Sequence, residues 1–264
     1  MNIFFKDTLD SSDTLQLELL LKDKKGSFLD ADGWWFAVQE KHLLCGCMAV
    51  YQTGADDFEC VPFVHPDMRR KGIFSSILAA ACKKGQIPGE GSVYFSCDAK
   101  NELWKKVLKH IGAEHAWDEH MMERKLWENE KITARFYCQI TENAAESMIN
   151  TNETTTADNA VWNAVGCRLD PHLPADLTAA PILPEVTCCL SPQGQSVYLY
   201  SLEVLSELRN QHLGTAFLSV LLPQLAKKGF KTIKLQVSSE NLPAMALYKK
   251  TGFRITQTLS FYEY

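Results

Sequence analysis

The feature that most constrains the fold of this chain is an internal repeat, in which similar residues recur 140 positions apart. One register aligns Val64 with Val204, Arg69 with Arg209, Val93 with Ile233, Asn101 with Asn241, and Gly112 with Gly252. A single unbroken offset indicates a duplicated structural unit rather than coincidence. The segments before Phe58 and before Tyr198 do not align at this offset, so we expect the two copies to differ there in their loops.

The length of the chain suits two such units. Its 264 residues divide into two domains of about 130 residues, each long enough for its own hydrophobic core. A charged stretch at Trp127–Lys131 separates the two patterns. We therefore expect one domain over residues 1–128 and a second over residues 131–264.

In the second copy, local patterns predict an alternation of strands and helices. Val, Tyr and Leu are frequent from Ser196 to Val204, which is typical of a strand. Apolar residues recur at helical spacing from Thr215 to Lys228, and Gly229 follows as a stop. The expected elements are strands at 196–204, 232–237 and the last ten residues, a loop at 205–211, and helices at 215–228 and 242–250.

The first copy repeats this pattern, with strands expected at 58–64 and 92–97 and helices at 73–84 and 102–110. Upstream we expect a helix at 14–22 and a hairpin of strands at 34–38 and 43–51. At the start of the second copy the sequence favours a helix at 142–151, a polar loop at 151–158 and a proline-rich loop at 171–184. This order predicts a βαβ crossover at the centre of each unit and an α/β fold with a mixed sheet.

Composition excludes several classes of function. A net charge of −5 and a pI near 5.8 argue against a general binder of nucleic acid or of anionic membranes. No apolar run approaches the roughly 18 residues of a membrane span, and the N-terminus lacks the apolar segment of a signal peptide. We therefore expect a cytoplasmic protein whose nine cysteines are reduced, structural thiols. No Cys or His spacing predicts a metal site.

Arg209, Gly214, Asn241, Tyr248 and Gly252-Phe253 follow one another along the second copy at a characteristic spacing. By these residues the second copy resembles the GNAT N-acetyltransferase superfamily, and the chain is similar to its tandem two-domain members. That family has a strand, a loop of pattern Arg/Gln-x-x-Gly-x-Gly/Ala and a helix, then an Asn followed seven residues later by a Tyr shortly before Gly-Phe. The matching residues here are Arg209, Gly214, Asn241, Tyr248 and Gly252-Phe253, with His212 in place of the first glycine. The match is good over residues 196–264 and loose over 131–195. The resemblance implies two tandem GNAT-like domains, each a mixed, splayed β-sheet flanked by helices.

The resemblance implies acetyl-CoA as cosubstrate. A pyrophosphate needs several convergent backbone N–H donors, which the start of a helix supplies together with a favourable dipole. Small residues, or residues that adopt positive φ, let the phosphates approach, which points to Gly214 and Asn210. The pantetheine arm would add alongside the preceding strand. The expected cofactor-binding residues are Leu202, Val204, Arg209, Asn210, Gln211, His212, Leu213, Gly214, Thr215, Ala216 and Asn241.

By the same resemblance, Tyr248 is the acid that protonates the departing thiolate. Glu203 is the candidate base that takes a proton from the amine. The alternative interpretation of Tyr248 is a core aromatic residue with a hydrogen-bonded hydroxyl, and that of Glu203 is a solvated carboxylate at a strand end. His212 is better explained as a loop residue that caps the helix than as a catalytic base.

The first copy has Phe74 at the position of Gly214 and Leu108 at the position of Tyr248. A bulky residue at the phosphate turn and the loss of the phenol predict that this copy has no transferase chemistry. We expect it to shape the fold and the acceptor pocket, with weak CoA binding as the alternative.

The function expected from the sequence is an acyl-CoA-dependent N-acyltransferase whose C-terminal domain is catalytic. It would transfer an acetyl group from acetyl-CoA to the primary amine of a small molecule or a peptide by direct attack. The alternative is a non-catalytic acyl-CoA-binding sensor or scaffold. The expected partner is the amine acceptor, with no nucleic acid and no membrane, and the chain would be a monomer or a homodimer.

Overall fold

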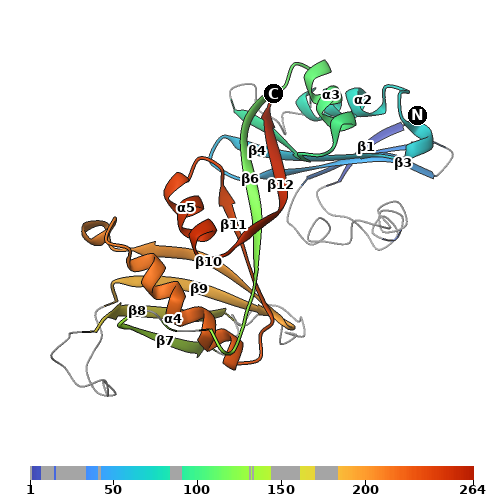
Figure 1. Cartoon of the computed structure of the whole chain (residues 1–264). Coiled ribbons are helices and arrows are strands. Elements are labelled where there is room, and N and C mark those ends of the chain that lie inside the picture. Colours follow the sequence, from blue (N-terminus) through green and yellow to red (C-terminus); the bar gives the residue numbers. More distant parts are fainter. Residues whose placement is uncertain are drawn as a thin grey trace. The chain divides into compact units, whose positions relative to one another are not determined.

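The computed structural model describes residues 2–6, 15, 34–40, 43–83, 91–130, 132, 134–143, 161–169 and 184–264. Within these residues it is a mixed α/β protein with twelve strands and four α-helices (Figure 1). The chain forms two compact units. Unit 1 consists of Met1–Trp117 and Leu259–Tyr264, and unit 2 consists of Asp118–Thr258.

Unit 1 contains a mixed sheet whose first four strands pair antiparallel with one another in chain order. Its strands are β1 (Asn2–Lys6), β2 (Trp34–Glu40), β3 (Leu43–Gln52), β4 (Asp57–Val64) and β5 (Ser92–Asp98). Its helices are a short 3₁₀ turn η1 (Pro66–Met68), α2 (Ile73–Lys83) and α3 (Glu102–His110). The crossover through α2 makes β4 and β5 parallel. Helix α2 packs on β2, β3 and β4.

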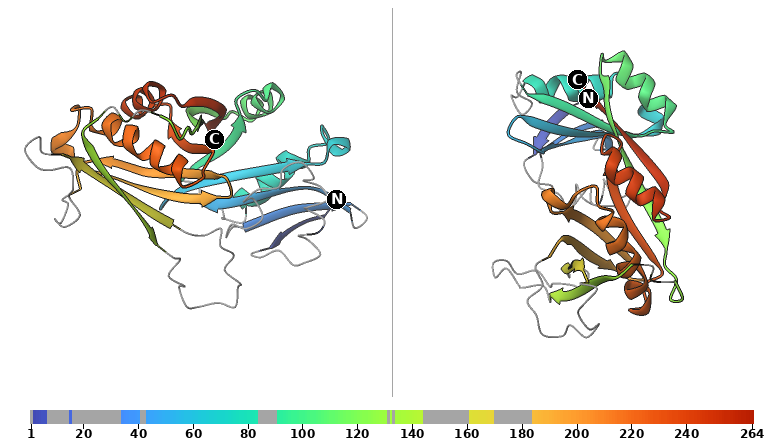
Figure 2. Two further views of the ribbon diagram at one scale, coloured as in Figure 1. Left: turned by 60° about the horizontal axis from the view of Figure 1, so that its bottom comes forward. Right: turned by 60° about the vertical axis from the view of Figure 1, so that its left-hand side comes forward.

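Unit 2 repeats this plan around α4, which lies across β7, β8, β9 and β10 (Figures 1 and 2). Its elements are most of β6 (Glu114–Lys125), then β7 (Phe136–Asn143), β8 (Val161–Arg168), β9 (Val186–Gln193), β10 (Ser196–Val204), η3 (Ser206–Leu208), α4 (Leu213–Lys227), β11 (Thr232–Ser238), α5 (Leu242–Lys250) and the first half of β12 (Arg254–Glu263). The sheet order is β6-β11-β10-β9-β8-β7. Strands β10 and β11 are parallel, so the predicted βαβ crossover is confirmed in both units.

The last strand of each repeat contributes to the unit formed by the other repeat. In unit 1, residues 259–263 of β12 pair antiparallel with β5. In unit 2, residues 119–125 of β6 pair antiparallel with β11. The compact units therefore differ from the repeat-based division into 1–128 and 131–264, which stays a proposal about duplication of the chain.

The 140-residue repeat is a repeat of backbone geometry as well as of sequence. Helices α3 and α5, strands β5 and β11, and turns η1 and η3 begin and end at positions 140 residues apart. Left-handed residues recur in the same way, with φ of 63° at Arg70 and 64° at Asn210. The glycines at 112 and 252 have φ of 88° and 89°. The duplication predicted from the sequence thus extends to individual turns.

The start of the second copy differs from the sequence prediction. The helix expected at 142–151 is contradicted where it begins, because Glu142 and Asn143 lie in β7. In β7 the buried residues Phe136 and Cys138 alternate with more exposed neighbours, which is the period of a strand. The sequence did not single out β7, β8 or β9. The rest of that predicted helix, the loop at 151–158, nearly all of the loop at 171–184 and nearly all of the helix at 14–22 lie outside the described residues.

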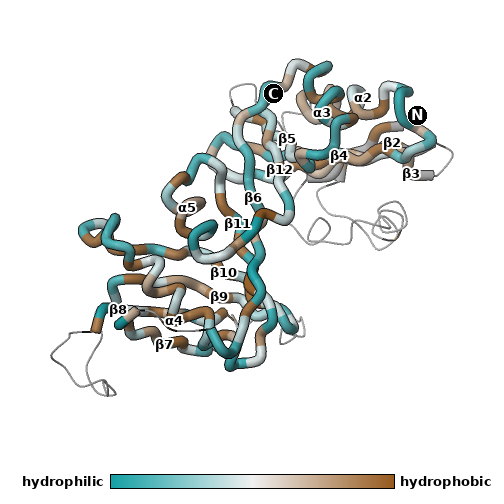
Figure 3. The backbone as a smooth tube through the Cα atoms, in the orientation of Figure 1, coloured by the Kyte–Doolittle hydropathy of each residue, from teal (hydrophilic) through white to brown (hydrophobic). Residues whose placement is uncertain are grey.

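Each unit has its own hydrophobic core. In unit 2 the core lies between α4 and the sheet, with Phe217, Leu218 and Leu221 fully buried. Figure 3 shows the hydrophobic residues along β9 beneath this helix. None of the nine cysteines, all of which lie in described residues, forms a disulfide, and six of them are buried. No helix in the described part of the chain is long and apolar enough to cross a membrane.

Candidate active site

Strands β10 and β11 separate near the middle of β10. Their parallel pairing covers only residues 196–198 of β10 and 232–234 of β11. On its other side β10 pairs with β9, and this register shifts between Tyr200 and Glu203. Ser201, within the shift, has a φ of +49°. A bulge of this kind bends the strand and re-aims its backbone groups. Beyond Tyr198 the β11-facing edge of β10 pairs with no strand in the described part of the chain.

Unit 1 has the separation of strands without the bulge. Strands β3 and β4 pair in one continuous register from Phe58 to Val64. Parallel pairing of β4 with β5 ends at Cys60 and Phe95. The bulge is thus specific to the second copy, although the two loops that follow have the same backbone geometry.

The predicted pantetheine segment begins within the bulge and continues after it. Leu202 and Val204 are half-buried and pack against the core of unit 2. Glu203 is exposed and lies opposite Thr187 of β9. The candidate base is therefore accessible to solvent at the end of β10.

The loop between η3 and α4 presents a row of unused backbone donors. The amides of residues 210–215 donate no hydrogen bond to any described residue. Asn210 and His212 both have left-handed backbones, with φ of 64° and 60°. Arg209 ties the loop to the strand before it, because its Nε donates to the carbonyl oxygen of Val204 at 3.2 Å. A turn of this kind at a helix start forms a concave anion site.

His212 occupies the N-cap position of α4, as expected, but its side chain makes no capping hydrogen bond. The backbone of His212 is left-handed, as is that of the equivalent Gly72, whose φ is 74°. The position therefore has the conformation for which the family pattern uses glycine. A histidine in this conformation carries a strain that glycine would not.

The first residues of α4 are packed rather than open. Leu213 and Gly214 are buried, and Thr215 and Ala216 are half-buried. A Cβ atom on Gly214 would lie 3.0 Å from Cδ2 of Leu247 in α5. The small size of residue 214 therefore serves the close approach of two helices.

Helix α5 positions both Asn241, just before its first residue, and Tyr248, about two turns later. Asn241 is the N-cap, and its Oδ1 accepts a hydrogen bond from the amide of Ala244 at 3.2 Å. Tyr248 is 6% exposed, with its ring 5.5 Å from that of Phe253. No hydrogen bond of its hydroxyl is found within the described residues.

Burial, with a smaller contribution from nearby Cys188, raises the pKa of Tyr248 to about 12. The phenol therefore keeps its proton at neutral pH. Leu108, at the equivalent position of unit 1, is fully buried and has no proton to give.

Unit 1 fills the space between the starts of α2 and α3 with aromatic rings. Phe74 contacts Phe95 and Trp104 edge-on, with ring centroids 5.8 Å and 5.2 Å apart. The Trp104 indole N–H also donates to the carbonyl oxygen of Ser96 at 3.4 Å. The equivalent residues of unit 2 are Gly214, Leu235 and Ala244. The expectation that Phe74 blocks the phosphate turn is thereby refined, because its ring packs against β5 and α3.

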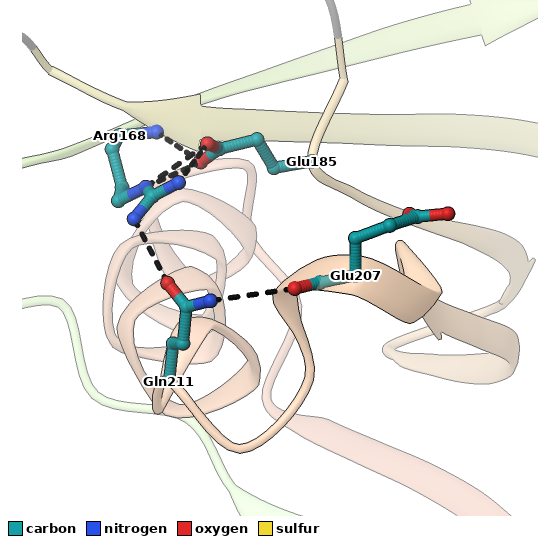
Figure 4. A network of polar contacts seen from close by, with 4 residues as sticks. All are labelled: Arg168, Glu185, Glu207 and Gln211. Atoms are coloured by element: carbon teal, nitrogen blue, oxygen red, sulfur yellow. Dashed lines mark hydrogen bonds and ion pairs between the residues drawn. The ribbon is translucent and has the colours of Figure 1, made fainter.

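A polar network that the sequence did not reveal lies beside the loop of unit 2. It joins Arg168 at the end of β8, Glu185 just before β9 and Gln211 in the loop (Figure 4). Only Gln211 belonged to the predicted set. Arg168 and Glu185 flank a segment of low sequence regularity and form no motif, so no local signal singled them out.

The described residues contain no cluster of His, Cys, Asp or Glu that could hold a metal ion. The candidate site consists of the loop at 209–216, the separated edge of β10, and Asn241 and Tyr248 of α5.

Comparison with known proteins shows what this geometry resembles. Residues 165–253 match the model of the acetyltransferase (GNAT) family. A comparison with curated proteins finds no match.

Solved structures of similar fold span both units. A tandem GNAT protein from the clavulanic acid biosynthesis pathway matches with a TM-score of 0.68 at 12% identity, covering 100% of this chain and 98% of that one. A GCN5-related N-acetyltransferase from Sphaerobacter thermophilus gives 0.62 at 14% identity, covering 99% and 95%. A GNAT-family acetyltransferase from Colwellia psychrerythraea gives 0.58 at 13% identity, covering 100% of both chains. At these identities the likeness is one of fold. Residues 165–253 therefore resemble the acetyltransferase (GNAT) family, and the chain as a whole shares its fold with GNAT proteins.

Proposed function

We propose that the chain is an acyl-CoA-dependent N-acyltransferase that uses unit 2 to move an acetyl group from acetyl-CoA to a primary amine. The observation that carries the proposal is the run of unused amides from Asn210 to Thr215 at the start of α4. Backbone N–H groups at a helix start, reinforced by the helix dipole, suit a pyrophosphate. The acceptor we propose is the amine of a small molecule or of a peptide.

The neighbouring backbone also suits the rest of the cosubstrate. Beyond Tyr198, β10 has no pairing with β11, so its edge is free to hydrogen-bond an extended amide-bearing arm. The bulge at Ser201 turns this edge where the arm would lie. Bound there, acetyl-CoA supplies an acyl thioester, whose carbonyl carbon accepts the attacking amine.

The direct reaction forms a C–N bond and breaks a C–S bond, and one proton must leave nitrogen while another reaches sulfur. Tyr248 supplies the second proton in this proposal, because its hydroxyl stays protonated and has no partner among the described residues. Glu203 receives the first proton, directly or through water. Its exposed position at the end of β10 supports this role.

Unit 1 in this proposal supports the fold and the acceptor pocket without chemistry of its own. Its aromatic cluster of Phe74, Phe95 and Trp104 occupies the positions that hold Gly214, Leu235 and Ala244 in unit 2. Leu108 replaces the phenol. We regard residues 1–128 and 131–264 as the two duplicated domains of the chain, with their last strands exchanged between the compact units.

The test is a pair of matched loop variants of the full chain. Asn210→Glu places a carboxylate among the loop amides of unit 2, and Arg70→Glu does the same at the equivalent left-handed position of unit 1. Calorimetry with CoA should show binding abolished by Asn210→Glu and retained by Arg70→Glu. Equal losses from both variants would place a CoA site in unit 1 as well.

Activity is then followed as thiol release from acetyl-CoA in the presence of a panel of primary amines. Amine-dependent release supports the transferase. Tight CoA binding with no release for any amine, and no change on Tyr248→Phe, would instead support a non-catalytic acyl-CoA sensor or scaffold.

A further inference from the structure

Arg168 and Glu185 form a multiply bonded ion pair at the side of the loop. Nε and Nη2 of Arg168 donate to Oε1 of Glu185 at 2.9 Å and 2.7 Å. The backbone amide of Arg168 donates to Oε2 of the same carboxylate at 2.8 Å. Both ends of the pair are thus fixed to β8 as well as to each other.

The remaining arm of the guanidinium reaches the loop. Nη1 of Arg168 donates to Oε1 of Gln211 at 3.1 Å, and Nε2 of Gln211 donates to the carbonyl oxygen of Glu207 at 3.5 Å. The Gln211 carboxamide therefore bridges the end of β8 and turn η3, as Figure 4 shows. Gln211 itself lies between Asn210 and His212, the two left-handed residues of the loop.

The charges show what Arg168 is suited to do. Glu185 neutralises the guanidinium, and the side chain of Glu185 is only 17% exposed while that of Arg168 is 48% exposed. Burial alone would raise the pKa of Glu185, but hydrogen bonds from Arg168 outweigh it and lower that pKa. A neutralised cation with three of its five N–H groups already in hydrogen bonds attracts a phosphate weakly, yet it can hold a neighbouring amide side chain in one place.

Unit 1 has the same loop backbone without this network. The backbone bond between Leu205 and Glu185 in unit 2 recurs between His65 and Cys45 in unit 1, at 3.0 Å and 2.9 Å. The side chain at the position of Glu185 is that of Cys45. The residue equivalent to Gln211 is Lys71, whose Nζ contacts Sδ of Met68 at 3.3 Å.

We propose that Arg168 is a positioning residue of unit 2, which holds Gln211 so that the loop amides are arranged for the pyrophosphate before acyl-CoA arrives. This inference rests on the proposed function. It deepens that function, because it assigns the preorganisation of the cosubstrate site to residues outside the family pattern. Ordering the loop in advance removes a cost that binding would otherwise carry.

The test is CoA binding by calorimetry with the full chain. Gln211→Met, on an exposed loop position, should weaken the Kd for CoA about 10-fold, the size expected when ordering of one or two side chains is lost. Arg168→Lys keeps a cation for Glu185 but lacks the planar fork, so it should weaken CoA binding similarly while the urea midpoint stays near that of the parent. Once acetyl-CoA is saturating, kcat should be unchanged in Arg168→Lys.

Two double variants separate positioning from other roles. If Arg168 acts through Gln211, Arg168→Lys with Gln211→Met should bind CoA no more weakly than the worse single variant. Additive losses would mean that Arg168 contacts the ligand itself and would overturn the proposal. The double variant Arg168→Met with Glu185→Met removes both charges, and it should still bind CoA weakly. Recovery of binding would show that the loss came from an unpaired carboxylate.

Lys71→Met is the matched control in unit 1, and it should leave the Kd for CoA unchanged. Failure of the parent protein to bind CoA would contradict the proposed function itself. Parent binding that Gln211→Met and Arg168→Lys both leave intact would contradict only the positioning role.

Discussion

The ring of Phe74 stands edge-on to the indole of Trp104, with centroids 5.2 Å apart and an angle of 74° between the rings. The same two positions of unit 2 hold Gly214 and Ala244. The two units thus have different side chains packed between the starts of their paired helices. In unit 1 the space is filled by aromatic side chains, and in unit 2 Leu247 of α5 closely approaches Gly214.

This difference leads to a first prediction. Ala244→Trp should copy the indole of Trp104 into unit 2 and weaken CoA binding by at least about 10-fold, which corresponds to about 1.4 kcal/mol. Leu242→Trp is the control, because Leu242 lies in the same helical turn and is 71% exposed. Titration calorimetry measures both. Unchanged affinity in Ala244→Trp would show that the ligand does not use this space.

A second prediction concerns the contact between α4 and α5. Gly214→Ala should lower the free energy of unfolding by about 1–3 kcal/mol, because the new methyl group meets Leu247 at 3.0 Å. Adding Leu247→Ala to Gly214→Ala should cost less than the sum of the two single changes. Urea denaturation of the parent, both single variants and the double variant gives the coupling. Strict additivity would mean that the two residues do not meet.

The third prediction tests the proposed acid. Tyr248→Phe should lower kcat about 100-fold, the contribution typical of general acid catalysis, with the Kd for CoA little changed. The hydroxyl can be removed at small structural cost because it has no hydrogen-bond partner in the described part of the chain. Tyr137→Phe, on β7, is the control for loss of a phenol. A large rise in the Kd with kcat unchanged would assign Tyr248 to binding rather than to proton transfer.

A fourth prediction follows from the buried thiols. Burial raises the pKa of Cys47 from 9.0 to about 12, and those of Cys60 and Cys138 also reach about 12. In the unfolded chain these thiols ionise near 9, so the folded state holds more protons between pH 9 and 12. The free energy of unfolding should be insensitive to these groups below pH 9 and should fall as the pH rises above it.

Urea midpoints measured from pH 8 to pH 10.5 check this dependence. Cys47→Ala should make the alkaline decline in the free energy of unfolding shallower. Cys82→Ala, at an exposed thiol, should change this slope less. An alkaline decline with the same slope in the parent and in Cys47→Ala would contradict the assignment to this thiol.

Much of the architecture could be predicted from the sequence because local patterns and the repeat agree. The crossover helices and their parallel strands follow from apolar spacing, and α5 was placed at Leu242–Lys250 by the same signals. Strand β7 was not predicted, since Glu142 and Asn143 begin a stretch whose composition favours a helix. Pairing with β8 decided that they extend a strand instead.

The candidate site also has a part that the sequence predicts and a part that only the structure reveals. The sequence predicts the loop at 209–216, Asn241 and Tyr248, because their spacing within one segment resembles a family pattern, and their roles stay predictions. It also identified the duplication, because equivalent turns need equivalent residues such as Gly112 and Gly252. Only the tertiary structure revealed the bulge at Ser201, the exchange of the last strands and the bracing of Gln211 by Arg168. Each of these depends on which distant segments lie side by side, and contacts between distant segments leave no period or spacing in a single sequence.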